Sequence, residues 1–305
     1  DAGSIAAMFR LGERYRVGLG VERDYAQAVE WDQRAINEKD VDDNSYFSIG
    51  YINAKLIECY YFLGESYFTG DGMEQDYAQA VEWYQKAADA ENAEAMSRMG
   101  DCYFQGLGVE RDYARAIEWY QKAAELGDTR AMVALGGCYE EGLGLEQDNE
   151  QAIQWYQKAA KAGNPEAMMS LGSYYDANAK DREDMELAAE WYQKAEEAGS
   201  LEARAKVSEI CYQLGFLSSD LEDSKEGLMW YQKAADAGNI EAMREIGTFY
   251  FYHGENDEQR SLAAEWYLKA AEAGDDQAMH FLGGCYIGGI GVERDYEKAI
   301  ELYRK

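Results

Sequence analysis

The hydrophobic residues of the chain fall into short runs with the spacing of amphipathic helices. In the stretch 93–128, Ala95, Met99 and Tyr103 are each four residues apart, which places them on one face of a helix. A second run, at 116–123, follows a glycine-containing break and has apolar residues at spacings of three and four. The pattern predicts a pair of amphipathic helices joined by a short turn.

The same pair recurs along the whole chain, most often with a period of 36 residues. Tryptophan marks the second helix and occurs at positions 31, 83, 119, 155, 191, 230 and 266, and Leu302 occupies an eighth such place. A fixed period of this length is typical of stacked helix pairs, so the sequence predicts a single all-α solenoid of about eight repeats. The predicted repeats are 5–40, 57–92, 93–128, 129–164, 165–200, 201–239, 240–275 and 276–305, with an insertion at about 41–56.

The glycines of the chain occupy fixed places in this repeat. One set falls inside the first helix, where the missing side chain permits close approach of a neighbouring helix: Gly100, Gly136, Gly172, Gly247 and Gly283. A second set follows the second helix, as expected of a left-handed helix end: Gly127, Gly163, Gly199, Gly238 and Gly274. Gly-x-Gly pairs, such as Gly106 and Gly108, predict the turn between the two helices. Because they recur at one place and lack a following Gly-Lys-Ser/Thr, we interpret them as structural turns and not as phosphate-binding loops.

The combined pattern, A-x-x-x-L-G-x-x-Y-x-x-G-x-G-V-x-x-D-x-x-x-A-x-x-W-Y-x-K-A-A-x-x-G, resembles the Sel-one-like repeat family, which is related to the tetratricopeptide repeat. The resemblance covers essentially the whole chain. It implies a right-handed α/α superhelix that scaffolds protein complexes. It supplies no generic catalytic residues.

Two irregularities interrupt the repeat. The first residues align with the end of a repeat, at 236–240, and the chain stops inside a second helix, so we expect a segment of a longer protein. The insertion at 41–56 is either a binding loop or a helical extension that packs on the solenoid, and its apolar residues favour packing.

The charge of the chain narrows the range of partners. It carries 29 basic and 59 acidic residues, for a net charge of −30. Such a surface repels nucleic acid and anionic membranes, and no apolar run is long enough to insert into a bilayer. It attracts basic proteins, although the alternative is that the acidity only keeps the protein in solution.

The reactive and metal-ligating residues of the sequence do not form a recognisable catalytic or metal-binding motif. His253 and His280 are the only histidines, and a calcium loop starting at Asp40 fails at its sixth and twelfth positions. We predict no catalytic residues, no metal site, no cofactor and no enzymatic activity. The five cysteines, at 59, 102, 138, 211 and 285, are predicted to be unpaired core residues, which favours a cytoplasmic location.

In the related tetratricopeptide architecture, the first helix of each pair lines a concave groove. The groove positions combine carboxylates with aromatic side chains, a composition used by peptide-binding grooves. The predicted partner-binding residues are Phe9, Glu13, Glu58, Tyr61, Glu65, Phe68, Glu94, Asp101, Phe104, Glu140, Glu209, Tyr212 and Phe251. The alternative is that these aromatic residues only brace neighbouring helices.

These observations favour a scaffold or adaptor that binds a protein or peptide with basic and apolar residues in the groove. One alternative is an inhibitor or immunity-type protein that neutralises a single basic partner. Another is an enzyme with an unrecognised carboxylate site. The sequence leaves the oligomeric state open.

Overall fold

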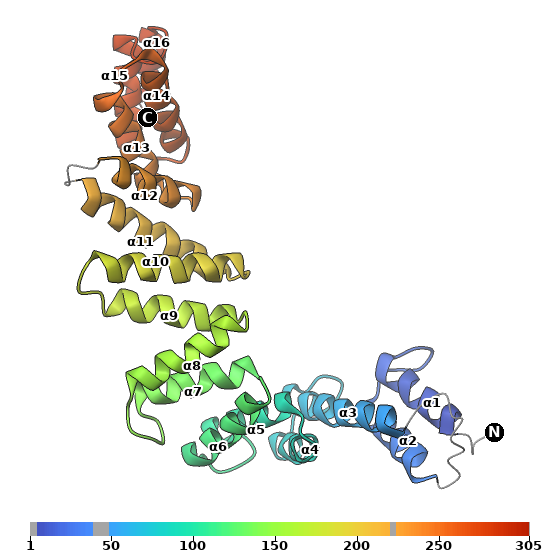
Figure 1. The fold of residues 1–305 in the computed structure, drawn as a ribbon. Helices are drawn as coiled ribbons and strands as arrows, with labels where there is room; N and C mark the ends of the chain where they lie inside the picture. The colour runs from blue at the N-terminus through green and yellow to red at the C-terminus, as the bar shows by residue number, and fades with distance from the viewer. Residues whose placement is uncertain (1–4, 39–48, 220–223, 305) are drawn as a thin grey trace. The chain divides into compact units, whose positions relative to one another are not determined.

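The computed structural model describes residues 5–38, 49–219 and 224–304, and all regular secondary structure in these ranges is helical. The chain divides into two compact units, residues 1–162 and 163–305 (Figure 1). Unit 1 contains α1 (Ile5–Val17), α2 (Tyr25–Asn37), α3 (Ile49–Thr69), α4 (Tyr77–Asp89), α5 (Ala93–Gln105), α6 (Tyr113–Glu125), α7 (Thr129–Glu141) and α8 (Asn149–Lys161). Unit 2 contains α9 (Pro165–Ala177), α10 (Arg182–Glu197), α11 (Leu201–Ser219), α12 (Ser224–Asp236), α13 (Ile240–His253), α14 (Asp257–Glu272), α15 (Asp276–Gly288) and α16 (Tyr296–Arg304).

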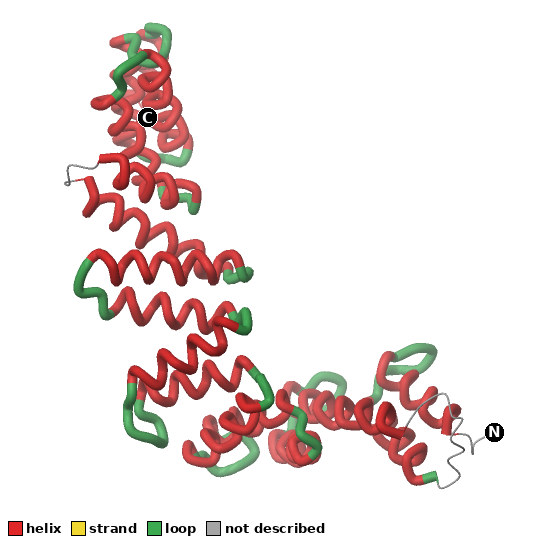
Figure 2. Tube along the Cα trace, in the orientation of Figure 1, coloured by secondary structure: helices red, strands yellow, loops and turns green. Residues whose placement is uncertain are grey.

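The helices pack in consecutive pairs. Each odd-numbered helix packs against the helix that follows it, and within a unit each pair packs against the next pair through its second helix. Figure 2 shows the short connections between the helices. This arrangement confirms the predicted fold of stacked helix pairs.

The helix ends follow from residues that the repeat carries at fixed places. The aspartate of the V-x-x-D motif is the N-cap of the second helix; the Asp112 carboxylate accepts a hydrogen bond from the Arg115 backbone N–H at 3.1 Å. Asn164 caps α9 in the same way, and Pro165 occupies its first turn. Gly106, with a φ of 77°, ends α5 in the left-handed conformation.

A tyrosine from the second helix covers the mid-helix glycine of the first helix in nearly every repeat. A Cβ atom added to Gly100 would lie 2.4 Å from Cε1 of Tyr120. The same tyrosine–glycine contact occurs at Gly64, Gly136, Gly172, Gly215, Gly247 and Gly283. The glycines therefore bring the two helices of each pair close enough for a ring to lie between them.

The first repeat replaces this tyrosine with Asp32, which is completely buried against Gly12. Asp32 forms an ion pair with Arg16, whose Nε also donates a hydrogen bond to Sγ of Cys59 at 3.1 Å. Burial raises the pKa of Asp32 to about 6, although the neighbouring guanidinium lowers it. The first repeat thus holds a buried charged cluster where the other repeats hold a ring.

The described part of the insertion is helical. Residues 49–56 form the beginning of α3, and Ile52 is buried in a cluster with Ile5 and Met8. Residues 41–48 lie outside the described part of the chain. All five cysteines are buried and free, and burial raises the pKa of each thiol to about 11 or 12.

Lysine side chains cover the tryptophans of the second helices. Nζ of Lys86 lies 3.5 Å from the ring centroid of Trp83, and Nζ of Lys158 lies 3.9 Å from that of Trp155. The same contact joins Lys122 to Trp119, Lys194 to Trp191, Lys233 to Trp230 and Lys269 to Trp266. The second helices therefore cover part of their own aromatic surface.

Candidate partner-binding site

The predicted groove residues define a surface that we call the first-helix face. Each unit has its own such face, formed by the exposed side chains of α1, α3, α5 and α7 in unit 1 and of α9, α11, α13 and α15 in unit 2. Most of the predicted residues are exposed or half-buried: Glu13, Glu58, Tyr61, Glu65, Phe68, Glu94, Asp101, Phe104, Glu140, Glu209, Tyr212 and Phe251.

Phe9 is the exception, and its assignment to the partner-binding surface is wrong. Its side chain is 0% exposed and packs in a cluster with Ile5 and Ile52. The ring of Tyr51 contacts that of Phe9 edge-on, with 5.6 Å between the centroids. Phe9 is covered because the insertion lengthens α3, so that residues absent from the other repeats reach over it.

In unit 1, Glu65 of α3 is held by a neighbouring arginine. Arg98 of α5 donates two hydrogen bonds to the Glu65 carboxylate, at 2.7 and 2.8 Å, which makes a bidentate pair. The Tyr84 hydroxyl donates a third, at 2.6 Å. Burial and this bond to Glu65 raise the pKa of Tyr84. Glu65 therefore links α3, α4 and α5.

Asp101 of α5 occupies the next position of the same kind. It accepts a hydrogen bond from the Tyr120 hydroxyl at 2.9 Å and lies 3.5 Å from Arg98 and from Arg130. Burial raises the pKa of Asp101, against the effects of Tyr120 and the two arginines. Two arginines thus neutralise Glu65 and Asp101 within the protein, which leaves these carboxylates little charge to offer a basic partner.

Tyrosine hydroxyls reach the first-helix face in both units. Tyr156 donates to Glu140 at 2.7 Å, Tyr192 donates to Ser173 at 3.2 Å and Tyr267 donates to Thr248 at 3.1 Å. The same ring that covers the mid-helix glycine therefore also fixes a polar side chain on the face.

The predicted aromatic residues also pack within the protein. Phe68 contacts Tyr77 edge-on at 5.2 Å between centroids, and Phe104 contacts Tyr113 at 5.1 Å. Each of these tyrosines begins the following second helix. The rings of Phe68 and Phe104 thus brace the turn within the repeat and also keep part of their surface exposed.

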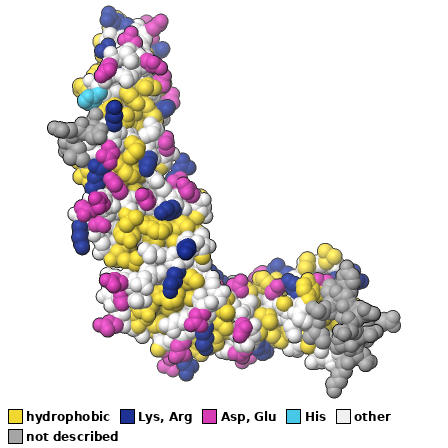
Figure 3. Space-filling model, in the orientation of Figure 1, with side chains coloured by type: hydrophobic (Ala, Val, Ile, Leu, Met, Phe, Trp, Pro, Cys, Tyr) yellow, Lys and Arg dark blue, Asp and Glu magenta, His cyan; other side chains and the backbone are white. Residues whose placement is uncertain are grey.

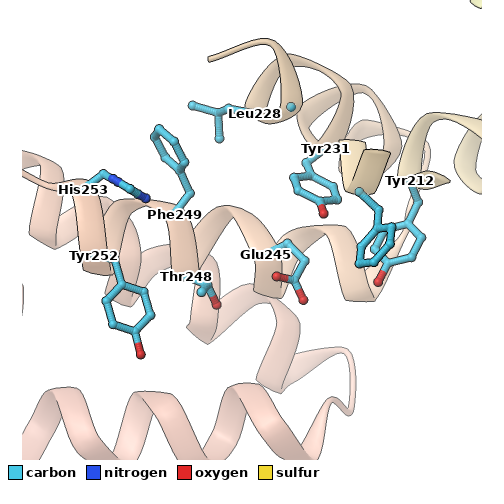
Figure 4. A pocket seen from close by; sticks show the side chains of 10 residues that line it. Tyr212, Leu228, Tyr231, Glu245, Thr248, Phe249, Tyr252 and His253 are labelled. Atoms are coloured by element: carbon cyan, nitrogen blue, oxygen red, sulfur yellow. The ribbon is translucent and has the colours of Figure 1, made fainter. Parts of the chain in front are cut away.

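Unit 2 contains a pocket of about 250 Å³ between α11, α12 and α13 (Figure 4). Tyr212 and Phe216 line it from α11, Tyr231 from α12, and Phe249 and Tyr252 from α13. Two of these rings are open to solvent, since Phe216 is 59% and Tyr252 is 70% exposed. Figure 3 shows hydrophobic side chains in patches on the visible surface of unit 2.

Polar groups enter this pocket from α13. Glu245, Thr248 and His253 all line it. The Thr248 hydroxyl donates to the Arg244 carbonyl oxygen at 3.0 Å and accepts from Tyr267, so its bonds are made within the protein. Burial, and then the charge of Glu245, raise the pKa of Tyr212. Glu245 is the one carboxylate among the lining residues.

Tyr212 was predicted from the sequence as a partner-binding residue, whereas Phe216, Glu245, Phe249 and Tyr252 were not. A signal for α13 was present in residues 249–253, which are five consecutive rings, Phe-Tyr-Phe-Tyr-His. Successive helical residues point about 100° apart, so such a run cannot face one core and must expose some of its rings. The pairs Arg98–Glu65 and Arg130–Asp101 were not predicted because each joins two different helices.

The described residues hold no group of three His, Cys, Asp or Glu side chains arranged to bind a metal ion. Residues 40–44, where a calcium loop was weighed, lie outside that part of the chain. None of the helices searched in it is both long and apolar enough to cross a bilayer.

Comparison with known families agrees with the repeat. The Sel1 repeat model matches at residues 5–40, 57–92, 93–128, 129–164, 165–200, 201–239, 240–275 and 276–305. The chain belongs to the Sel1 repeat family. Sel1 repeat proteins generally act as protein-interaction scaffolds and are typically not enzymes. The comparison with curated proteins gives no match.

Solved Sel1 repeat structures are similar to this chain. A Sel1 repeat protein from Oxalobacter formigenes is 30% identical with a TM-score of 0.55, over 76% of this chain and 87% of that one. The protein c5321, a protective antigen of uropathogenic Escherichia coli strains with an SLR fold, is 25% identical with a TM-score of 0.54, over 99% of this chain and 76% of that one. The immunity protein Pa5087 from Pseudomonas aeruginosa is 21% identical over 81% of each chain, with a TM-score of 0.39, which is too low to bear on function.

Proposed function

We propose that this Sel1 repeat protein is a scaffold that binds a partner protein through a peptide segment lying on the first-helix face. The observation that carries the proposal is the open aromatic pocket of unit 2, where Phe216 and Tyr252 expose large rings to solvent. Exposed aromatic side chains gathered around a pocket are typical anchors of protein interfaces. The tryptophans of the second helices, in contrast, are covered by their own lysines.

The partner segment in this proposal combines apolar anchors with basic residues. The net charge of −30 supports its basic character, because it attracts cations over long range. Exposed carboxylates of the first-helix face, such as Glu94 and Glu209, would meet those basic residues. Glu65 and Asp101 contribute less, because Arg98 and Arg130 already neutralise them.

Selection of peptides from a random display library on the whole protein tests this function. We expect several peptides to be selected. Binding should fall about tenfold or more with Tyr61→Ala for a peptide that binds unit 1, or with Phe216→Ala for a peptide that binds unit 2, since such anchors contribute roughly 1–2 kcal/mol or more. Glu118→Ala and Lys122→Ala on α6 are the matched second-helix controls and should leave binding unchanged. Circular dichroism checks that each variant is folded. The proposal is wrong if no peptide is selected, or if Glu118→Ala or Lys122→Ala weakens binding as much as the first-helix variants do.

A further inference from the structure

The residues that line the pocket between α11, α12 and α13 indicate which kind of side chain it would bind. Its lining includes five phenylalanine and tyrosine rings, the imidazole of His253 and the carboxylate of Glu245, and no lysine or arginine. Its volume of about 250 Å³ lies below the roughly 300–1,000 Å³ of ordinary small-molecule sites. The pocket therefore fits one large side chain better than a cofactor.

The charge around Glu245 is only partly compensated within the protein. Arg244 lies 3.2 Å from Glu245 and 2.6 Å from Asp275, so one guanidinium serves two carboxylates. These three groups together keep a net negative charge. An apolar side chain that filled the pocket would remove water from Glu245 without giving its carboxylate a new hydrogen-bond partner in place of that water, which costs free energy.

A side chain with an apolar stem and a cationic end would complement both the aromatic rings and the Glu245 carboxylate of the pocket. Aromatic faces attract cations, and an arginine guanidinium also stacks on rings and donates hydrogen bonds to a carboxylate. Figure 4 shows Glu245 on α13 between Phe249 of the same helix and Tyr212 of α11, with Tyr231 and Leu228 of α12 above α13 in this view. An incoming side chain would thus meet rings from three helices and the carboxylate together.

We propose that this pocket binds an arginine side chain of the partner segment, with its methylene stem against the rings and its guanidinium at Glu245. The inference rests on the proposed scaffold function and specifies one residue of the partner. Arginine is favoured over lysine because its planar group both stacks on rings and makes two parallel hydrogen bonds to a carboxylate.

The test uses three short peptides that differ at one position. The peptide Ac-Gly-Ala-Arg-Ala-Gly-NH2 is compared with peptides that carry citrulline, its uncharged isostere, or norleucine, an apolar stem, in place of arginine. Binding to the whole protein is followed by NMR titration of the resonances of Phe249, Tyr252 and His253. We expect the arginine peptide to bind about fivefold or more tightly than either of the others.

Two variants assign this preference to the carboxylate. Glu245→Gln should bring the arginine peptide to the affinity of the citrulline peptide. Glu265→Gln, an equal charge change at an exposed position of α14, should keep the preference. Equal binding of all three peptides to the wild-type protein would overturn the arginine assignment, and so would a preference that survives Glu245→Gln.

Failure of this inference can be separated from failure of the scaffold function. If none of the three peptides shifts the pocket resonances but displayed peptides still bind through Tyr61, only the arginine pocket is wrong. If no displayed peptide binds at the first-helix face either, both proposals are wrong.

Discussion

The first-helix faces of the two units are built on the same repeat but use their polar groups differently. In unit 1 the residue after the mid-helix glycine includes Glu65 and Asp101, and arginines of the same unit bind both carboxylates. In unit 2 the equivalent positions include Phe216 and Thr248, which line an open pocket. The tyrosine–glycine contact is therefore common to both units, whereas the residue after the glycine is a paired carboxylate in parts of unit 1 and lines an open pocket in unit 2.

The largest effect is expected from disrupting the tyrosine–glycine contact, which occurs in both units. In Gly100→Ala and Gly247→Ala the new Cβ would lie 2.4 Å from the Tyr120 ring and 2.7 Å from the Tyr267 ring. These rings are buried and cannot withdraw, so each substitution should lower the free energy of unfolding by about 2–3 kcal/mol. Equilibrium urea unfolding followed by circular dichroism measures the loss.

Gly137→Ala is the matched control for this prediction. It lies next to Gly136, but its nearest atom is the Tyr156 hydroxyl oxygen at 3.8 Å, an ordinary contact. Because alanine favours helix more than glycine does, this variant should gain about 0.5–1 kcal/mol. A neutral result for Gly100→Ala would show that the ring does not rest on the glycine.

A smaller effect is expected from unpairing the carboxylates of unit 1. Arg98→Met leaves Glu65 and Asp101 partly buried without their shared cation, which should cost about 2 kcal/mol in unfolding free energy. Arg115→Met, at a side chain that is 63% exposed, should leave the unfolding free energy nearly unchanged, because water screens its ion pair with Asp112.

A triple variant tests whether this loss comes from unpaired charges. Adding Glu65→Gln and Asp101→Asn to Arg98→Met should recover most of the loss, because the cost comes from the unpaired charges and not from the missing side chain. If Arg98→Met is no more harmful than Arg115→Met in urea unfolding, the face of unit 1 is not closed by its own ion pairs.

The helix pairs could be predicted from the sequence because most repeats contain the same local signals for the start and end of a helix. The N-cap aspartates and the glycines act within one turn of helix, so sequence distance is enough to assign them. Helical periodicity placed Tyr61, Phe68 and Phe104 on the unburied face of the first helices, and the resemblance to tetratricopeptide repeats assigned that face to the groove. These residues keep exposed surface there.

The pairing of charges and the burial of Phe9 could not be predicted in the same way. Arg98 bonds to Glu65 across 33 positions, and this contact depends on how neighbouring repeats stack. Phe9 is covered by the extra helical turns of α3, which a repeat pattern does not contain. In both cases the decisive neighbour lies in another repeat and outside the local period.

The smallest effect is expected at Asp32, the buried carboxylate in the core of the first repeat. Its folded-state pKa of about 6 is above its ordinary value near 3.8, so the folded protein binds this proton more readily than the unfolded chain. The contribution of Asp32 to stability is therefore full below about pH 4 and is lost as the pH rises through 6. Asp32→Asn removes this titration, so the unfolding free energy of the wild type relative to the variant should rise by about 1 kcal/mol from pH 7 to about pH 5.3. Urea unfolding at both pH values measures the difference, and a constant or falling difference would mean that the ion pair with Arg16 outweighs the burial of the carboxylate. That result would mean that Asp32 is stabilised by its ion pair, as the other carboxylates of unit 1 are. The predicted rise would mean that the cost of burying the charged carboxylate exceeds the gain from the ion pair.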